Sequence, residues 1–256
     1  MNLATYFSPL ILLALFTSCN GSNNQVEQAQ LSETKKNDTT SIAIDSVFYK
    51  LLLTGQLSEN TDSVFSLLPG KLTSKPIYVH KEVAPHLIKM IQEAGKEGVH
   101  LTIISGYRSF SDQKRIWERK WAESSEKDDS TKALQIMKYS AMPKTSRHHW
   151  GTDVDINSVD NSYFESGRGL KEFEWLQKNA ASFGFHNVYD NKASSGRKGY
   201  EMEKWHWSYL PMSEKFLDYY NQLIHYSEIN GFSGSNSAQK CNAIEEYVNG
   251  ITIPKH

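Results

Sequence analysis

The hydrophobic and polar positions divide this chain into three parts. Residues 10–16 form a short apolar run, residues 20–44 are polar, and the remainder mixes apolar and polar segments. The polar part has too few apolar residues to bury a core, so it is predicted to be a flexible tether. A folded domain is therefore predicted over residues 45–256, with helices at its C-terminal end.

Helical periodicity is clearest in three segments of the predicted domain. Residues 81–94 place apolar side chains on one face and are followed by two glycines, as in an amphipathic helix and its end. Ser109 or Ser111 is placed to cap a helix that runs to about residue 122. A third helix is predicted from about residue 171 to residue 183. Further helices are expected over residues 48–53 and, as a pair, at the end of the chain.

Three shorter segments have the pattern of β-strands, namely residues 101–104, 152–156 and 205–209. Strands and helices do not alternate regularly along the chain, which argues against a doubly wound parallel sheet. The predicted fold class is α+β, with a small, mostly antiparallel sheet flanked by helices.

Composition and charge narrow the classes of function. The 256 residues include 39% hydrophobic and 22% charged residues, with a formal net charge of -1. A chain without a basic excess lacks the electrostatic basis for binding a polyphosphate backbone, so nucleic acid is not an expected partner. A monomer is expected. All six tryptophans lie between residues 117 and 207, which fits a Trp-rich core and an aromatic cleft equally well.

The N-terminal region has the features of an export signal. The apolar run over residues 10–16 is too short to span a bilayer, which takes about 20 residues. The sequence Leu-Phe-Thr-Ser-Cys over residues 15–19 resembles a bacterial lipobox, although no basic residue precedes the run and Phe16 stands where leucine is usual. This resemblance implies a signal peptide over residues 1–19, a lipid anchor at Cys19 as the only link to a membrane, and a place in the cell envelope.

The second cysteine has a simpler interpretation. Cys241 recurs at helical spacing with Ala238, Ile244 and Val248. This pattern predicts a small, buried, apolar residue and not a metal ligand.

The segment from Ser146 to Asp155 combines a bend with a strand. Gly151 permits a tight bend, and the residues after it alternate between polar and apolar. Val154 and Ile156 would then face the core, and Asp153 and Asp155 would share the opposite face.

The same bend would bring a histidine back toward these carboxylates. An imidazole and a carboxylate at the end of a strand make half of a zinc site. The spacing does not choose between His148 and His149, nor between Asp153 and Asp155.

A second polar group lies at the start of the last predicted strand. Glu203 and His206 are three residues apart, so on a regular strand they would point to opposite faces. On a helical turn the same spacing places them on one face. If both serve one metal ion, Glu203 must lie on a turn that precedes the strand.

Together these motifs resemble the VanY-type D-alanyl-D-alanine carboxypeptidase family of zinc peptidases. That family shows Ser-x-His-x-x-Gly-x-x-x-Asp and, later, Glu-x-Trp-His, and residues 146–155 and 203–206 match both patterns in register. The Ser-Gly-Tyr-Arg sequence of residues 105–108, with Gln113, matches the upstream element of the family. The resemblance covers about half of the chain, from about residue 81 to about residue 211. It implies a hedgehog/D,D-peptidase-like fold with a zinc site in a cleft.

The resemblance also implies a set of metal ligands. His148, Asp155 and His206 would hold one catalytic Zn²⁺ ion, which leaves His149 and Asp153 outside the direct ligands. The family commonly has a small apolar residue where Asp153 stands. Asp153 is therefore a candidate to hold a ligand in place, and His149 is a candidate for the rim of the cleft or for simple packing.

The remaining roles concern water and substrate. Glu203 would act as the catalytic base, taking a proton from water and passing it to the leaving amine. Arg108, just past a strand end, would stabilise the oxyanion or bind a substrate carboxylate. The resemblance implies that Gln113 and Ser146 also contact the peptide. Gln113 shares a helix face with two tryptophans, so it is expected to point into an aromatic-walled cleft.

The resemblance therefore implies a zinc-dependent D,D-carboxypeptidase that removes the terminal D-amino acid from peptidoglycan stem peptides. An L,D-carboxypeptidase or an endopeptidase of the cross-links would use the same zinc chemistry and differ in the shape of the cleft. A non-catalytic module that binds wall peptides would have no need of a base at Glu203.

Overall fold

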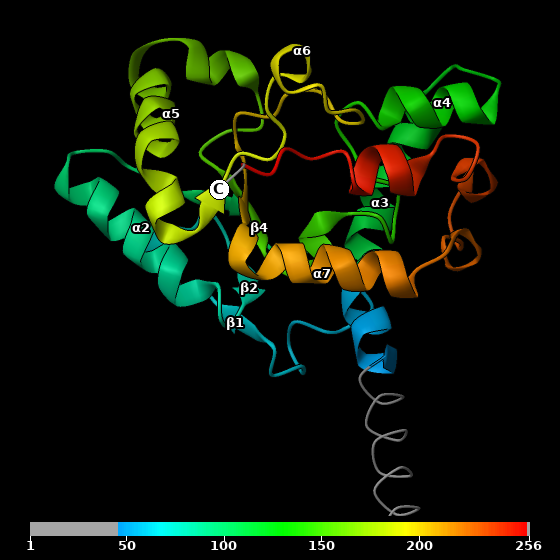
Figure 1. Cartoon of the computed structure of the whole chain (residues 1–256), viewed down its shortest axis with the longest axis horizontal. Coiled ribbons are helices and arrows are strands. Elements are labelled where there is room, and N and C mark those ends of the chain that lie inside the picture. Colours follow the sequence, from blue (N-terminus) through cyan, green and yellow to red (C-terminus); the bar gives the residue numbers. More distant parts are fainter. Residues whose placement is uncertain (1–45, 255–256) are drawn as a thin grey trace, which may run out of the picture. The chain divides into compact units, whose positions relative to one another are not determined.

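The structure is a computed structural model that describes residues 46–254 (Figure 1). These residues belong to one compact unit, Ser46–His256. The predicted signal peptide, Cys19 and the predicted tether lie outside the described residues. Within the described part of the chain, no helix combines the length and the apolar character needed to cross a membrane.

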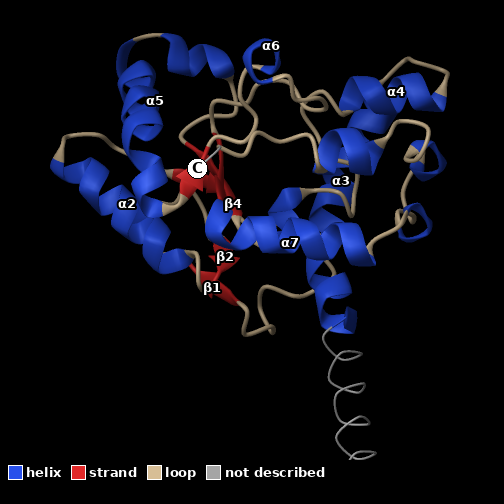
Figure 2. Ribbon diagram, in the orientation of Figure 1, coloured by secondary structure: helices blue, strands red, loops and turns tan. Residues whose placement is uncertain are grey.

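The strands form two small sheets in the midst of the helices (Figure 2). In both sheets every pair of neighbouring strands is antiparallel, which confirms the predicted α+β class. The smaller sheet pairs β1 (Phe65–Leu67) with β2 (Tyr78–His80). The larger sheet has the order β3-β4-β6-β5, made of β3 (Ile103–Ser105), β4 (Asp153–Ile156), β6 (His206–Tyr209) and β5 (Phe185–His186).

Helices lie at the predicted segments, although residues 180–183 form a separate 3-10 segment and the second helix predicted at the end of the chain is a short π-helix. The segment over residues 46–53 is helical. The other α-helices are α2 (Ala84–Lys96), α3 (Phe110–Glu123), α4 (Asp129–Ile136), α5 (Gly167–Asn179), the four-residue α6 (Lys192–Ser195) and α7 (Leu210–Leu223). The short 3-10 segments are η1 (Gly70–Leu72), η2 (Arg147–Trp150), η3 (Asn161–Glu165), η4 (Ala180–Phe183), η5 (Tyr226–Glu228) and η6 (Ser235–Ser237), and η7 (Ala243–Val248) is a π-helix. The sequence pattern did not predict α4, β1, β2 or β5.

Local sequence explains where α3 begins. Ser109 is its N-cap, and its hydroxyl accepts a hydrogen bond from the Asp112 amide at 3.1 Å. This contact satisfies one of the amides that a helix leaves unpaired at its start. Ser109, and not Ser111, is therefore the cap.

Two hydrophobic clusters hold the sheet in place. Val154 and Ile156 of β4 and Trp207 of β6 pack in one cluster with side chains of α2 and α5. The other cluster gathers α3, α4, α7 and the C-terminal segment around Trp117 and Trp150. In Figure 1, α2 and α5 lie on one side of β4, and α3 and α4 lie on the other. Cys241 is 3% exposed in the second cluster, as its spacing predicts.

The bend before β4 requires glycine. Gly151 has φ of 69°, and a Cβ there would lie 2.7 Å from the His80 amide nitrogen. We expect Gly151→Ala to lower the free energy of unfolding by about 1–3 kcal/mol through backbone strain, and by a similar further amount through the clash. Gly196→Ala is the matched control, because Gly196 has φ of 74° with no atom within 4 Å of the added carbon. Equal losses in urea titrations of the two variants would contradict the steric argument.

Candidate metal centre

Four polar side chains share the face of the large sheet that points away from α2 and α5. The register pairs Asp153 with Ser208 and Asp155 with His206, and each of the four is at most 4% exposed. Because alternate residues of a strand share a face, the apolar neighbours of these side chains lie in the core on the other side. The predicted division of β4 into an apolar and an acidic face is confirmed.

Three side chains bring one ligand atom each to a common point. The candidate ligand atoms of His148, Asp155 and His206 lie within 4.8 Å of one another. His148 Nε2 is 3.4 Å from Asp155 Oδ1, and His206 Nδ1 is 3.2 Å from the same oxygen. Two imidazoles and one carboxylate form a donor set that suits zinc and leaves a fourth position open. These are the three residues that the sequence motifs mark as ligands.

The outer nitrogen of each imidazole is engaged by an acceptor. His148 Nδ1 donates to the Gly106 carbonyl oxygen at 2.9 Å, and His206 Nε2 donates to Asp153 Oδ2 at 2.9 Å. Carbonyl and carboxylate oxygens only accept, so each outer nitrogen carries a proton. The inner nitrogens, His148 Nε2 and His206 Nδ1, both face Asp155, where a metal ion would take the place of a proton. Metal-binding histidines are commonly held in this way. The residues present therefore fit a zinc ion.

The charges at this point favour a cation. Burial alone would lower the pKa of His206, but its hydrogen bonds to Asp153 and Asp155 outweigh burial and raise that pKa to about 9. Burial would raise the pKa of Asp155, yet the neighbouring His148 and His206 hold it well below its usual range. The carboxylates thus stabilise positive charge between the rings, which a metal ion would supply in place of a proton.

Glu203 lies on a turn immediately before β6, as its spacing from His206 requires. The His206 amide donates to the Glu203 carbonyl at 3.2 Å, and Glu203 Oε2 is 3.9 Å from His206 Nδ1. Asn187 clamps the turn by donating to the carbonyl oxygens of Glu203 at 2.7 Å and of His206 at 2.8 Å. No sequence motif pointed to Asn187, because it lies 16 residues away from Glu203.

Burial makes Glu203 more basic than an exposed carboxylate. Burial raises the pKa of Glu203 to about 8, with Asp155 adding to the rise and His206 opposing it. A carboxyl group whose pKa lies near neutral pH can both take up and release a proton there, which suits general base and acid catalysis beside the candidate metal ligands.

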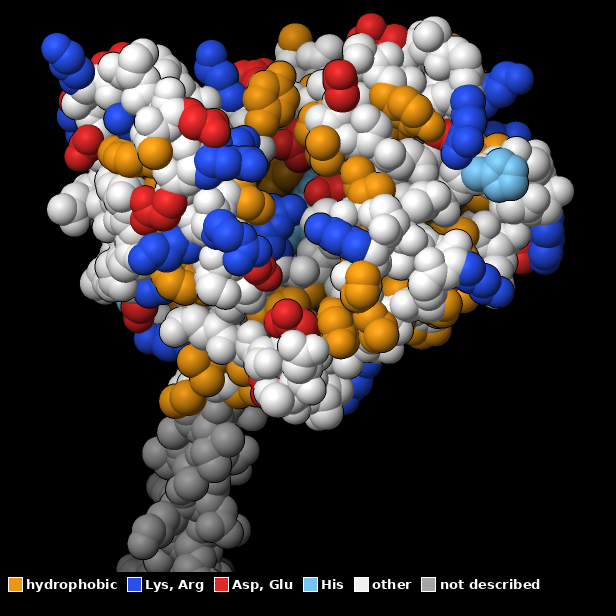
Figure 3. All heavy atoms as spheres, turned by 180° about the vertical axis from the view of Figure 1, so that it is seen from behind, with side chains coloured by type: hydrophobic (Ala, Val, Ile, Leu, Met, Phe, Trp, Pro, Cys, Tyr) orange, Lys and Arg blue, Asp and Glu red, His pale blue; other side chains and the backbone are white. Residues whose placement is uncertain are grey.

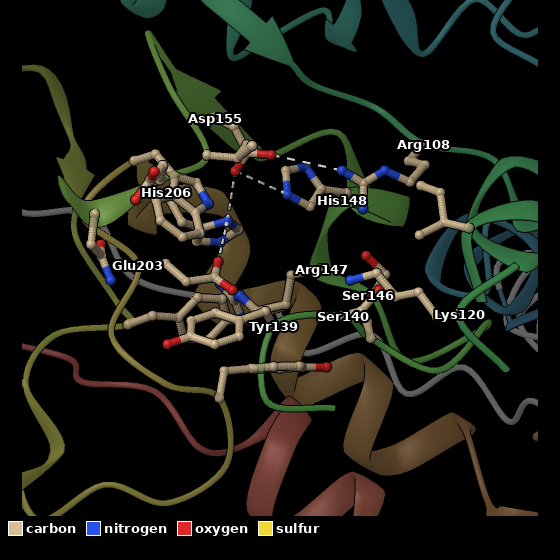
Figure 4. A pocket seen from close by; sticks show the side chains of 18 of the residues that line it. Arg108, Lys120, Tyr139, Ser140, Ser146, Arg147, His148, Asp155, Glu203 and His206 are labelled. Carbon is tan, nitrogen blue, oxygen red and sulfur yellow. Dashed lines mark hydrogen bonds and ion pairs between the residues drawn. The ribbon is translucent and has the colours of Figure 1, made fainter. Parts of the chain in front are cut away.

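A pocket of about 500 Å³ opens over these groups. Figure 3 shows this face hollowed near its middle, with basic, acidic and histidine side chains in the hollow. Besides the candidate ligands and Glu203, the residues that line the pocket include Ser146 and the cations Arg108, Arg119, Lys120 and Arg147. In Figure 4, Arg108 and Lys120 lie on the opposite side of the pocket from Glu203 and His206.

Comparison with known proteins identifies the family. Residues 76–212 match the family model described as VanY, D-alanyl-D-alanine carboxypeptidase. The chain belongs to this family. A Bacillus subtilis protein named as a carboxypeptidase, YodJ, is 34% identical over 135 residues, which are 52% of this chain and 46% of that protein. A D-alanyl-D-alanine carboxypeptidase of Enterococcus faecalis is 29% identical over 143 residues, 55% of this chain and 52% of that protein.

The chain thus spans about half the length of the curated relatives it matches. Among solved structures, VanYB in complex with D-alanine-D-alanine is 25% identical, with a TM-score of 0.48 over 66% of this chain and 88% of that chain.

The upstream element of the VanY family holds Arg108 at the pocket. Arg108 Nη1 donates to Gln113 Oε1 at 2.8 Å, and Nη2 donates to Ser105 Oγ at 2.9 Å. Nη2 also lies 3.7 Å from Asp155 Oδ2. The guanidinium is therefore fixed beside the candidate metal ligands and still lines the pocket.

Gln113 does not face the pocket, which corrects the sequence expectation. It is fully buried, and its amide nitrogen donates to the Ala141 carbonyl at 2.6 Å while its oxygen accepts from Arg108. Both ends of the amide are used inside the protein, so Gln113 supports Arg108 from behind. Trp117, one turn later, lies in the core, and Trp205 alone of the six tryptophans lines the pocket.

His149 is also internal and does not form the rim of the cleft. His149 Nδ1 donates to the Arg108 carbonyl at 2.6 Å, and its Nε2 accepts from the Lys144 amide at 3.1 Å. Burial lowers the pKa of His149 to about 3, so the ring is neutral. The ring of His149 thus links the loop of Arg108 to the segment that carries His148. This is the packing role predicted from the sequence as the alternative to a place at the rim.

Proposed function

We propose that this chain is a zinc-dependent D,D-carboxypeptidase that removes the terminal D-amino acid from peptidoglycan stem peptides. The observation that carries the proposal is the convergence of His148 Nε2, Asp155 Oδ1 and His206 Nδ1 beside Glu203 in the wall of a pocket. Membership of the VanY family supports the substrate class. Nucleic acid is not an expected partner, and a monomer is expected.

The roles of the side chains follow from their positions. His148, Asp155 and His206 would hold a zinc ion, which would supply Lewis acidity toward a peptide carbonyl and a water molecule. Glu203 would take the proton of the attacking water on its carboxylate and return it to the leaving amine. Arg108 would face the carbonyl oxygen that gains negative charge, because its guanidinium is fixed beside Asp155 and across the pocket from Glu203.

The charge of the pocket supports a carboxypeptidase over an endopeptidase. Arg108, Arg119 and Lys120 line the same pocket as the candidate ligands. A free C-terminal carboxylate is a natural partner for such cations, whereas the middle of a cross-linked peptide brings no such charge at the scissile bond. Ser146 lies at the pocket wall, where its hydroxyl is a candidate contact to the peptide.

The proposal extends to the place of the protein in the cell. The predicted export signal and the lipobox-like sequence around Cys19 support a lipoprotein held at the cell envelope. We expect the full chain in the membrane fraction of cells and Cys19→Ser in the soluble fraction. An unchanged distribution of the variant would contradict a lipid anchor at this residue.

Defined muropeptides test the reaction directly. We expect the full chain to release one D-alanine from a pentapeptide, as seen by mass spectrometry. Loss of D-alanine from a tetrapeptide would indicate an L,D-carboxypeptidase, and splitting of a dimer would indicate an endopeptidase. We expect a zinc chelator to stop the reaction and added zinc to restore it. Retention of peptides without any change in mass would instead indicate a binding module.

A further inference from the structure

A charged pair is buried directly behind His206. Arg147 Nε lies 2.9 Å from Asp153 Oδ2, and the two side chains are 1% and 0% exposed. The same carboxylate oxygen accepts from His206 Nε2 at 2.9 Å. The other oxygen, Oδ1, accepts from Thr152 Oγ1 at 2.7 Å and from Ser208 Oγ at 2.9 Å. Each oxygen of the Asp153 carboxylate thus accepts two hydrogen bonds.

Arg147 is held as tightly as its partner. Its Nη2 donates to Ser208 Oγ at 2.8 Å, and its guanidinium lies over the Trp150 ring, 4.5 Å from the ring centre. Its Nη1 is buried and has no hydrogen-bond partner within the described residues. The guanidinium therefore leaves Nη1 without a partner, while its Nε donates to Asp153 and its Nη2 donates to Ser208.

Stability alone does not account for this pair. Burying two charges carries a desolvation cost, and apolar side chains of similar volume often give equal or greater stability. A buried ion pair therefore calls for a role beyond folding, and its contact with a candidate metal ligand indicates one.

The two candidate histidine ligands are held differently. The outer nitrogen of His148 donates to a neutral carbonyl, whereas that of His206 donates to a carboxylate. A carboxylate in this position orients the ring and makes the inner nitrogen a stronger ligand. Tyr189 stacks on the His206 ring, with ring centres 4.5 Å apart and planes at 28°, so the ring is restrained on its face as well as at its edge.

We propose that Asp153, with Arg147 as its countercharge, is a positioning residue that fixes His206 with Nδ1 directed at the metal. Arg147 keeps a carboxylate at this buried position, and the carboxylate keeps the proton on Nε2. The inference rests on the proposed zinc site and adds to it a device that raises the affinity of one ligand. Ser208, across the strand pair, braces both partners.

Zinc affinity is the measurement that separates positioning from catalysis. We expect Asp153→Ala to raise the Kd for zinc roughly 10- to 100-fold in a chelator competition with the full chain. The cobalt-loaded variant should show a visible absorption spectrum different from that of the cobalt-loaded wild type, since the histidine ligand is no longer fixed.

A double variant separates positioning from charge balance. Asp153→Ala leaves Arg147 unpaired in the core, so Asp153→Ala with Arg147→Met removes both charges and keeps the volume of Arg147. We expect the double variant to unfold near the wild-type midpoint and still to bind zinc roughly 10- to 100-fold more weakly. Recovery of the wild-type Kd would overturn the proposal, because Asp153 would then serve only to neutralise Arg147.

Two further variants make every outcome informative. Asp153→Asn keeps the shape but not the charge, so it tests the carboxylate even if both alanine variants fail to fold. An unchanged Kd in Asp153→Asn would overturn the proposal. His206→Ala should lose tight zinc binding altogether. If the wild type did not bind zinc tightly, the proposed function itself would be refuted. If the wild type and the Asp153 variants bound zinc equally tightly, only the positioning role of Asp153 would be refuted.

Discussion

Glu203→Gln is expected to lower kcat for hydrolysis of a stem peptide by roughly 100- to 10,000-fold while zinc stays bound. Glutamine has the same length and volume but does not take up a proton near neutral pH. The turn that carries the residue should persist, because Asn187 holds it through backbone carbonyls that the substitution leaves in place. Steady-state kinetics and the zinc content of the purified variant measure the two halves of this expectation.

A nearby acid provides the matched control. Glu201 lies two residues earlier, pairs with Lys192 at 2.7 Å and does not line the pocket. Glu201→Gln should therefore keep nearly wild-type turnover. If Glu203→Gln retained turnover within about threefold of Glu201→Gln, Glu203 would not be the base, since loss of a base costs at least about 100-fold.

The parts of the fold that sequence predicts well are those in which side-chain period and burial agree. In β4, apolar Val154 and Ile156 alternate with Asp153 and Asp155, which predicts one face in the core and one acidic face. The structure confirms this division. The requirement for a turn at Glu203 was equally local, because an odd spacing excludes a shared strand face. Such inferences need only the geometry of one element.

The choice between neighbouring histidines was not local. His148 and His149 are consecutive in the 3-10 segment η2, so they leave the chain in different directions. One points to Asp155 and the other to the Arg108 carbonyl, 41 residues away. Spacing within the motif carries no information about that distant carbonyl. Only the register of the family pointed to His148, which the structure places beside Asp155.

For Gln113, the helical pattern predicted the correct helix face but the wrong surroundings. The spacing placed Gln113 and Trp117 on one face of α3, which is correct, but the pattern does not say whether that face meets a pocket or a core. Ala141 and Ser233 supply the carbonyls that receive their N–H groups, and both come from segments far along the chain. A helix face that carries tryptophan and glutamine can therefore lie in the protein interior, with its N–H groups hydrogen-bonded, as readily as in the wall of a binding pocket.

Arg108→Lys is expected to lower kcat/KM by roughly 100- to 1,000-fold, the scale observed for the loss of one oxyanion donor. Lysine keeps the positive charge but loses the planar set of donors that now reaches Gln113 and Ser105 at once. Its ammonium would not be held at the same point beside Asp155. Kinetics with a defined pentapeptide measure the loss, and Arg115→Lys on the exposed side of α3 is the control, with 76% of its side chain exposed.

A substrate whose terminal carboxylate is converted to an amide shows which role Arg108 has. If the guanidinium stabilises the oxyanion, Arg108→Lys lowers kcat by the same factor for the acid and the amide. If it binds the carboxylate, the amide is already a poor substrate for the wild type, and the substitution costs little more. Gln113→Leu should produce a smaller loss of the same kind, because it leaves Arg108 in place and removes one of its supports. Wild-type kinetics in Arg108→Lys would show that the charge alone, and not its fixed geometry, serves the reaction.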